Sequence, residues 1–216
     1  MQLVSLLLIV AAPSERAVSA PVSAAAVWSP PANFLASVHA ACEGNPARMP
    51  QCFPERMRAA GASPEAVAFT ERAGGLAYLR AFRDAGRVDE AWAVNPFRAN
   101  TNDIVYLVNG DPALLDVDDP KYMDPAVLAH HPACAAMLRA HPKLTPFPGD
   151  RYHHSAVQRM AAVGGGQRFV VGEDLRDGCH ACAILGKARV AFDFDAAGTF
   201  RGVQVLMVQG MPAPRP

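Results

Sequence analysis

The clearest alternation of apolar and polar side chains lies near the C-terminal end of the chain, between residues 189 and 208. Val190, Phe192 and Phe194 share one parity and charged residues occupy the other, which is the pattern of a strand with one buried face. After a glycine-containing turn, residues 199–208 are apolar at both parities, and this favours a strand in the interior of a sheet. The two segments therefore predict a C-terminal hairpin.

The first part of the chain is patterned as helices. Residues 32–42 carry apolar side chains at helical spacing, and residues 54–61 begin with a proline and end with a glycine, as short helices do. A third helix begins at the Ser63 cap, which a proline and an acidic residue follow. Its apolar positions continue to Gly86, and the glycine pair at 74–75 predicts a kink or a division into two helices.

Between these two parts the apolar period changes from that of strands to that of helices and back. Three short strands joined by turns predict a β-meander, and a helix broken at Pro132 follows. The predicted segments are, in order, strands 87–94, 103–108 and 113–117, helix 126–140, an extended loop 143–150, a short helix 152–163, a flexible glycine link 164–166 and strand 167–171.

This order of elements predicts the α+β fold class. We expect an N-terminal helical layer packed on one antiparallel sheet of about five to six strands that ends in the C-terminal hairpin. The chain has 216 residues, of which 51% are hydrophobic, so it is long enough for one domain, which we assign to residues 32–210. The Ala/Ser/Pro-rich residues 21–31 predict a flexible lead-in, and residues 211–216 a disordered tail.

The N-terminal end resembles a secretory signal peptide. Residues 3–12 are almost entirely apolar, and the small residues up to Ala20 offer a cleavage site, so residues 1–20 are predicted to be removed on export. Two features depart from the usual pattern, since no Lys or Arg precedes the apolar run and Glu15 and Arg16 follow it. The run is too short to span a bilayer, and no later segment predicts a membrane span. We expect a periplasmic or secreted protein.

The overall charge is balanced. The chain carries 20 Lys and Arg residues against 20 Asp and Glu residues, for a formal net charge of zero. A balanced chain has no bulk attraction to polyanions, so no nucleic-acid partner is predicted. The many arginines, alanines and prolines are typical of a protein from a GC-rich bacterial genome.

The cysteine count supports export. The chain has 5 cysteines, and in an oxidising compartment we pair Cys42 with Cys52 and Cys179 with Cys182, which leaves Cys134 as a free thiol. The sequence does not fix this connectivity.

The Cys179-His180-Ala181-Cys182 motif has three interpretations. In thiol-disulfide oxidoreductases such a motif stands at the start of a helix, and a His between the two cysteines stabilises the thiolate. Here a strand pattern follows the motif instead. A closed zinc site needs two further ligands, and Cys134 with His130 or His131, or Cys42 with Cys52, would supply them only through long-range folding. A structural disulfide at the start of the hairpin is the interpretation that we favour, and no metal or other cofactor is predicted.

Other polar clusters carry weaker signals. His153, His154 and Ser155 lack the Gly-x-Ser-x-Gly sequence of a nucleophile elbow, and we expect them to face solvent. Asp193 and Asp195 share the polar face of a strand and are also expected to be solvated. A third acidic cluster lacks the spacing and closing Glu of an EF-hand, and its members are Asp116, Asp118 and Asp119.

Parts of the sequence resemble two known protein families. The sequence NPFRAN at residues 95–100, together with the GCHACA and FDFD segments, is similar to a group of exported, uncharacterised proteobacterial proteins over residues 63–208. A more distant likeness is to the periplasmic inhibitors of vertebrate lysozyme, in which a disulfide-closed loop carrying a His blocks the lysozyme cleft. This resemblance implies a Cys179–Cys182 bridge with His180 as the blocking residue, although the loop is shorter here.

Together these patterns predict a non-catalytic exported α+β domain that binds a protein or cell-envelope ligand through loops set on a rigid sheet. The candidate contact residues are His180, Arg98 and Asn100. The alternative is a thiol-redox or metal-dependent enzyme that uses the Cys179-x-x-Cys182 motif. Reaction with iodoacetamide near neutral pH, together with metal analysis, distinguishes the two, since the enzyme requires either a thiol of lowered pKa or a bound metal.

Overall fold

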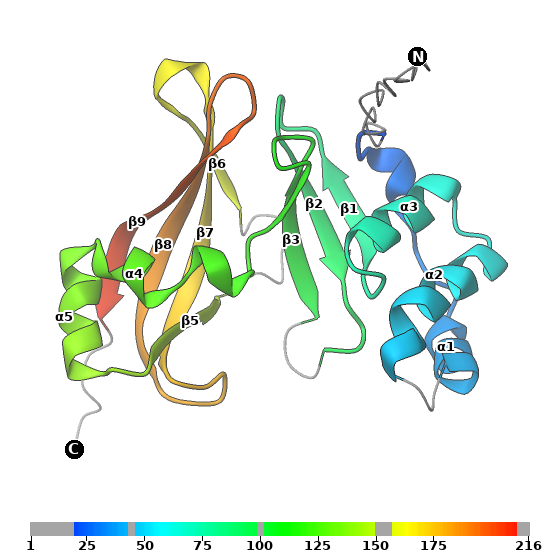
Figure 1. Ribbon diagram of the computed structural model, residues 1–216, viewed down its shortest axis with the longest axis horizontal. Helices are drawn as coiled ribbons and strands as arrows, with labels where there is room; N and C mark the ends of the chain where they lie inside the picture. Colours follow the sequence, from blue (N-terminus) through cyan, green and yellow to red (C-terminus); the bar gives the residue numbers. More distant parts are fainter. Residues whose placement is uncertain (1–19, 43–45, 99–101, 150–156, 211–216) are drawn as a thin grey trace, which may run out of the picture.

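The computed structural model describes residues 20–42, 46–98, 102–149 and 157–210, which form an α+β fold, as the sequence predicts. They contain two antiparallel sheets and not the single sheet expected (Figure 1). The first has 4 strands in the order β1-β2-β3-β4, and the second has 5, in the order β5-β7-β8-β9 with β6 paired to β7.

The strands are β1 (Tyr78–Arg83), β2 (Asp89–Val94), β3 (Asp103–Val108), β4 (Leu114–Asp116), β5 (Leu144–Pro148), β6 (Gln158–Ala161), β7 (Gln167–Asp177), β8 (Ile184–Phe194) and β9 (Phe200–Gly210). The α-helices are α1 (Phe34–Cys42), α2 (Met49–Ala59), α3 (Pro64–Arg72), α4 (Pro125–Ala129) and α5 (Pro132–Ala140). Short 3-10 turns are η1 (Ala24–Ala26), η2 (Pro46–Arg48), η3 (Pro120–Tyr122) and η5 (Val163–Gly165).

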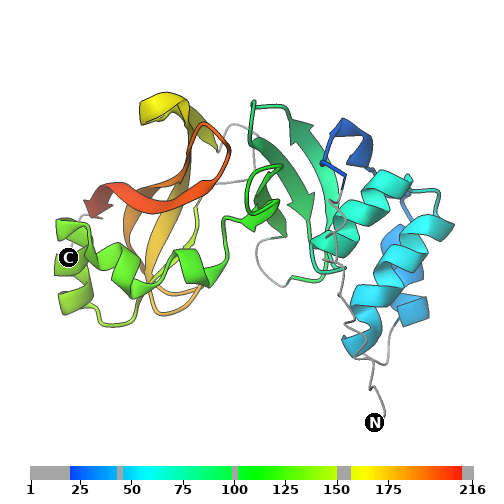
Figure 2. The same ribbon diagram turned by 45° about the horizontal axis from the view of Figure 1, so that its top comes forward.

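The elements follow one another in layers along the longest axis of the molecule. Helices α1–α3 cover one face of the first sheet and the second sheet lies on its other side, in both views (Figure 1, Figure 2). Ala91 and Ile104 belong to the core beneath the helices, whereas Trp92 and Val105 belong to the core shared with the second sheet. Because both faces of β2 and β3 are buried, these strands are apolar at both parities.

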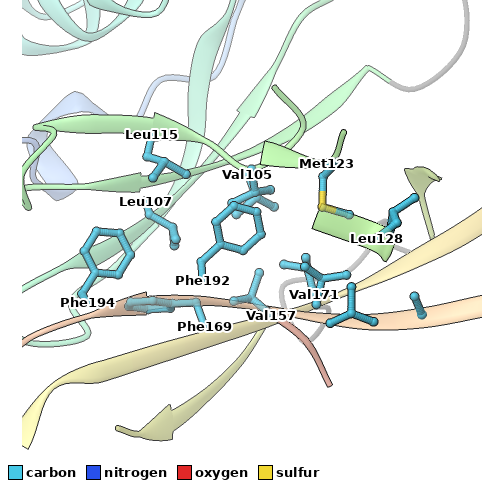
Figure 3. Packing of buried hydrophobic residues seen from close by; sticks show 14 of the residues in the cluster. Val105, Leu107, Leu115, Met123, Leu128, Val157, Phe169, Val171, Phe192 and Phe194 are labelled. Carbon is cyan, nitrogen blue, oxygen red and sulfur yellow. The ribbon is translucent and has the colours of Figure 1, made fainter. Parts of the chain in front are cut away.

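The largest apolar core lies between the two sheets, and η3, α4 and α5 contribute to it. Figure 3 shows side chains of both sheets and of α4 pointing toward one another, among them Val105, Leu107, Leu115, Leu128, Phe169, Phe192 and Phe194. Residues far apart in the sequence therefore hold the two sheets together.

A disulfide joins the first two helices. Cys42 of α1 is bonded to Cys52 of α2, which confirms the predicted pairing. Phe34, Phe53 and Met57 fill a separate small core between these helices and α3. The bridge restrains a helical layer whose own core is small.

Helix α2 begins earlier than predicted. It starts at Met49, and Pro54 lies inside it instead of at its first turn. A proline has no N–H for the carbonyl four residues earlier, which here is that of Pro50. Gly75 approaches this carbonyl so closely that a Cβ at residue 75 would lie 2.1 Å from its oxygen. The glycine turn after α3 therefore covers the turn of α2 in which Pro54 removes a backbone hydrogen bond.

The third helix is shorter than predicted. It ends at Arg72, and Gly74 and Gly75 then take positive φ angles of 85° and 76°, which reverse the chain. The predicted continuation of the helix to Gly86 is wrong, because Tyr78–Arg83 forms β1 and pairs with β2. The glycine pair separates a helix from a strand and not one helix from another.

Residues 21–31 are packed on the domain, in contrast to the flexible lead-in expected. Val22 and Ala26 are buried in the core between the helices and the first sheet. The side-chain amide of Asn109 accepts from the N–H of Val22 (2.7 Å) and donates to its carbonyl (2.8 Å). The domain therefore begins before residue 32.

The predicted Ser63 cap is confirmed, and it also anchors this segment. Its Oγ accepts from the N–H of Ala66 (3.1 Å) and donates to the carbonyl of Ala25 (2.9 Å). We expect Ser63→Ala to lower the free energy of unfolding by about 1 kcal/mol in urea denaturation, the usual cost of losing such a cap. Ser37→Ala is the matched control and should be nearly neutral, because Ser37 only bonds back to the carbonyl of Phe34 within α1. Equal effects of the two substitutions would contradict the anchoring role.

Two strands of the second sheet come from segments predicted to have other structures. Leu144–Pro148, expected as an extended loop, is β5, whose two prolines are tolerated because it is an edge strand. Gln158–Ala161, part of the helix expected at 152–163, is β6. Residues 152–156 of that prediction lie outside the described residues. The glycines at 164–166, expected as a flexible link, form the turn between β6 and β7.

The C-terminal hairpin is confirmed, with β8 paired to β9. Its return strand is an edge of the sheet, however, and not an interior strand. Val205 on the inner side of β9 is buried, whereas Met207 on the outer side is 53% exposed. A β-bulge falls between the pairs Val190–Val205 and Arg189–Met207, so Val205 and Met207 face opposite sides of the sheet although they are two residues apart. The apolar residues at both parities therefore reflect a change of the core-facing parity at this bulge.

The helical segment after the first sheet is divided at Pro132 into α4 and α5, as predicted. Asp124 caps α4 by accepting from the N–H of Val127 (2.9 Å). Cys134 of α5 is a buried free thiol, in agreement with the predicted pairing. None of the described helices is long and apolar enough to cross a membrane.

Candidate functional site

Cys179 and Cys182 form the second predicted disulfide, in the connection between β7 and β8. The N–H of Cys182 donates to the carbonyl of Cys179 (3.0 Å), so the bridge closes a tight turn. Gly178, directly before the bridge, has a φ of 87°, which favours glycine. We call residues 178–183 the disulfide loop.

The disulfide loop lies against the outer face of the second sheet, the face directed away from the shared core. The ring of His180 packs edge-on against Phe147 of β5, with 5.4 Å between ring centroids, and is half-buried. Arg176 Nη1 donates to the carbonyl of Cys182 (3.1 Å). His180 therefore rests on the sheet in a restrained, half-buried position.

Asp174 connects the disulfide loop to the middle of the sheet. Its Oδ2 accepts from Arg176 (3.0 Å) and its Oδ1 accepts from Lys187 Nζ (2.9 Å). Together with the Arg176 bond to Cys182, these contacts form one continuous chain of hydrogen bonds. Bonds between charged groups are stronger than neutral ones, so the outer face and the loop are held as one surface.

A cavity of about 570 Å³ lies beside Asp174 at the edge of the second sheet, and residues of both sheets line it. Strand β5 pairs with residues 173–177 of β7, Gly149 continues this ladder by donating to the carbonyl of Gly172 (3.0 Å), and β6 pairs with residues 167–170. The residues that line the cavity are Arg83, Gly149, Val157, Gln158, Gly172, Glu173, Asp174, Lys187, Ala188 and Arg189.

The acidic side chains that line the cavity are buried, and the basic ones are exposed to solvent. Its carboxylates are buried, since Glu173 is 4% and Asp174 is 7% exposed. Its cations reach solvent, since the side chains of Arg83 and Lys187 are 44% and 55% exposed. Among the described residues that line the cavity, the basic side chains are therefore more exposed than the acidic ones.

Arg83 reaches the cavity from the first sheet. It forms an ion pair with Glu90, which is fully buried, and its guanidinium lies 5.3 Å from the centre of the Trp92 ring. Burial raises the pKa of the Glu90 carboxyl, and the bond to Arg83 opposes this increase. Arg83 is therefore balanced by its own counter-charge and serves mainly as a wall of the cavity.

The second predicted contact segment, NPFRAN, lies on the first sheet. Phe97 anchors it by packing edge-on against Phe53 at 5.4 Å. Arg98 is exposed, and its guanidinium lies 4.0 Å from Oδ2 of Asp116. Asn100 lies outside the described residues. Arg98 and His180 thus belong to loops of different sheets.

Asp116, which lies beside this segment, has a raised pKa. Burial, followed by the neighbouring charge of Asp118, raises the pKa of Asp116 to about 6. The N–H of Asp118 donates to Asp116 (2.8 Å) and Arg98 lies nearby, and both oppose the increase. The same burial, with the charge of Asp116, raises the pKa of the Tyr106 hydroxyl.

The arrangement around the disulfide loop suits binding more than thiol chemistry. Cys182 leads directly into β8, so the helix N-terminus that lowers a cysteine pKa in oxidoreductases is not next to it. No three His, Cys, Asp or Glu side chains are grouped to hold a metal ion in the part of the chain that the structure describes. His153, His154 and Ser155 lie outside that part.

The acidic pair expected to be solvated has specific partners. Asp193 receives two hydrogen bonds from Arg168 on the neighbouring strand β7, at 2.6 and 2.7 Å. Asp195 accepts from the N–H groups of Ala197 and Thr199 in the hairpin turn, both at 2.9 Å. These carboxylates therefore stabilise the sheet.

The cavity is the feature that the sequence patterns did not indicate. Lys187 and Arg189 alternate with apolar residues on β8, and this parity could have placed both on one face of the sheet. The pairing of Gly172 with Arg189, and the pairing of β5 and β6 with different ends of β7, depend on contacts between distant segments. When compared with protein-family models, curated proteins and solved structures, the chain gives no match, so the site is interpreted from its own geometry.

Proposed function

We propose that the protein is an exported, non-catalytic domain that binds a protein or cell-envelope ligand at the outer face of its second sheet. The contact surface consists of the disulfide loop and the adjoining cavity. One observation carries this proposal: the bonds from Lys187 through Asp174 and Arg176 to Cys182 join the loop and the cavity wall. A surface that is already ordered before binding loses little entropy when a ligand arrives.

Export is supported by the two disulfides, Cys42–Cys52 and Cys179–Cys182, because such bonds persist in oxidising compartments. The likeness to the lysozyme inhibitors supplies a specific partner to test. In that case His180 would enter the lysozyme cleft from its half-buried position on the sheet. Arg98 is the second candidate contact, on the first sheet.

We expect Cys179→Ala/Cys182→Ala to weaken binding about tenfold or more, because the loop then has to be ordered on binding. Binding is measured by co-sedimentation with the isolated cell-envelope fraction of the source organism and by inhibition of vertebrate lysozyme. His180→Ala should weaken binding similarly. His130→Ala, which changes an exposed histidine at the end of α4, should leave binding unchanged.

The thermal midpoint of each variant separates loss of the loop from loss of the fold. If the double cysteine variant keeps its midpoint and binds both probes as the wild type does, the disulfide loop is not the contact surface. Wild-type protein that neither sediments with envelope nor inhibits lysozyme would count against the binding function itself.

A further inference from the structure

We propose that the Cys179–Cys182 bond is a redox switch, which a dithiol reduces reversibly and whose reduction releases His180 from its position on the sheet. This inference rests on the proposed function where it concerns binding, because it names how the same contact surface is regulated. It is argued from the exposure of the two disulfides, from the contacts that close the disulfide loop and from the charge beside its sulfurs.

The two disulfides differ in their access to solvent. Cys179 is exposed and Cys182 is half-buried. In the other bond, Cys42 is only 6% exposed and belongs to the core of the helical layer, and Cys52 packs against that core. Reduction by thiol exchange requires that a thiolate reaches one of the two sulfurs. A dithiol in solution therefore reaches Cys179 more readily than either sulfur of the other bond.

The two disulfides also restrain different amounts of structure. The cysteines of the disulfide loop are 3 residues apart in the sequence, whereas Cys42 and Cys52 are 10 apart and join two helices. A bridge that closes a longer loop restrains the unfolded chain more and stabilises the fold more. Opening the shorter bridge therefore leaves the fold largely intact.

The effect of reduction is confined to a few residues. The N–H of Asp177 donates to the carbonyl of Ala183 (3.2 Å) directly below the disulfide loop, and β7 and β8 are paired beyond this point. Within the loop, Gly178 has a φ of 87°, and a glycine can adopt many other conformations once the bridge is open. Residues 178–182 therefore gain freedom while the sheet keeps its register.

His180 is the side chain that this freedom affects most. It lies between the two cysteines, and its ring packs edge-on against Phe147 with 5.4 Å between the centroids. One edge-on ring contact is weak compared with the conformational entropy that the loop regains on reduction. The oxidised loop thus holds His180 on the sheet, and the reduced loop does not.

The exchange balances in electrons and protons. A thiolate of the dithiol attacks Sγ of Cys179 and forms a mixed disulfide, while the Cys179–Cys182 bond breaks and Cys182 leaves as a thiolate. The second thiolate of the dithiol then closes its own disulfide and releases Cys179 as a thiolate. Both protein thiolates take up the protons that the dithiol lost. The dithiol is oxidised by two electrons, and the protein is the substrate of this exchange and not its catalyst.

Positive charge lies beside the sulfur that leaves. The Arg176 guanidinium donates to the carbonyl of Cys182 (3.1 Å). Its counter-charge, Asp174, is shared with a lysine of β8, and the neighbouring Asp177 is exposed to solvent, which screens its charge. A nearby cation stabilises a thiolate and makes it a better leaving group. This favours attack at Cys179 and departure of Cys182.

The test follows the reduction of the oxidised protein by dithiothreitol at neutral pH. Samples are stopped with acid, unfolded in excess N-ethylmaleimide and mapped by peptide mass spectrometry. Cys179 and Cys182 should become labelled about tenfold faster or more than Cys42 and Cys52, which are the control within the same molecule. Arg176→Gln should slow labelling of the loop about threefold, whereas Arg176→Lys keeps the charge and should react as the wild type does.

Nuclear magnetic resonance reports the release of His180. Backbone resonances of residues 178–182 and ring resonances of Phe147 should shift on reduction and return on reoxidation, while those of the paired parts of β7 and β8 stay in place. Cys179→Ser/Cys182→Ser should give the reduced spectrum without any reductant and should not respond to dithiothreitol. Selectively reduced protein with its loop thiols blocked should sediment with the cell-envelope fraction about tenfold more weakly.

The switch is overturned if both disulfides are reduced at equal rates, if Cys42–Cys52 is reduced first, or if the loop and Phe147 resonances do not change. An unchanged rate for Arg176→Gln overturns the assignment of Cys182 as the leaving sulfur. Selective reduction that releases His180, in a protein whose sedimentation ignores the disulfide loop, would keep the redox response and remove the proposed function. Loop-dependent sedimentation without selective reduction would remove only the switch.

Discussion

Replacing Phe192 with alanine is expected to lower the free energy of unfolding by about 3–5 kcal/mol, the usual cost of removing a buried aromatic ring. Phe192 is fully buried between the two sheets (Figure 3). Its ring also contacts Tyr122 of η3 and Phe200 of β9, with centroids 6.0 and 6.4 Å away. The substitution therefore leaves a cavity where three parts of the fold meet, and chemical denaturation followed by tryptophan fluorescence measures its cost.

The same experiment tests whether the two sheets form one cooperative unit. The core that contains Phe192 extends from Ala85 to Val205, so both sheets should unfold in a single transition in wild type and variant. Met207→Ala is the control, because Met207 is 53% exposed on the outer face, and it should cost less than about 0.5 kcal/mol. A cost below about 1 kcal/mol for Phe192→Ala, or two separate transitions, would show that the sheets are not held by this core.

The parts of the fold that local chemistry determines could be predicted from the sequence. Ser63 caps its helix as expected, because a cap is a contact within four residues. The alternation around Phe192 identified a strand with one buried face, and both disulfides were paired as expected. Each of these features depends on neighbours close in the chain.

The parts that depend on distant segments could not be predicted in this way. Two prolines in β5 suggested a loop, and only its pairing with β7 at the edge of the sheet makes it a strand. The apolar pattern of β9 suggested an interior strand, but the pattern does not record which neighbours are present. The division into two sheets follows from the core between them.

One part of the candidate site could likewise be predicted from the sequence, and the other part could not. His180 and its disulfide were indicated by the spacing of the cysteines. Asp174, Lys187 and Arg189 became one site only through the register between β7 and β8, which places Asp174 opposite Lys187 and Gly172 opposite Arg189. The cavity also requires that β5 and β6 pair with different ends of β7.

Replacing Asp116 with asparagine is expected to stabilise the protein at pH 8 by up to about 3 kcal/mol and to have little effect at pH 4. Burial raises the pKa of Asp116 from its ordinary value of 3.8 to about 6, and a pKa difference of about two corresponds to about 3 kcal/mol. Because the folded pKa lies above the unfolded one, the stability linked to this proton is fully present below pH 3.8 and is lost as the pH rises through about 6. Asparagine is neutral at every pH and keeps an oxygen for the N–H of Asp118.

Urea denaturation of wild type and variant at intervals between pH 4 and pH 8 gives the difference directly, since titrations elsewhere in the chain cancel. Asp119→Asn is the matched control, because Asp119 bonds to Lys121 and the pKa of Asp119 is lowered instead of raised. Its stability difference from wild type should not grow more favourable as the pH rises. A constant difference for Asp116→Asn across this range would mean that Asp116 is not buried as a protonated group. If the difference has the expected slope, protonation of Asp116 also removes the counter-charge 4.0 Å from Arg98, so the NPFRAN segment presents more positive charge as the pH falls through about 6.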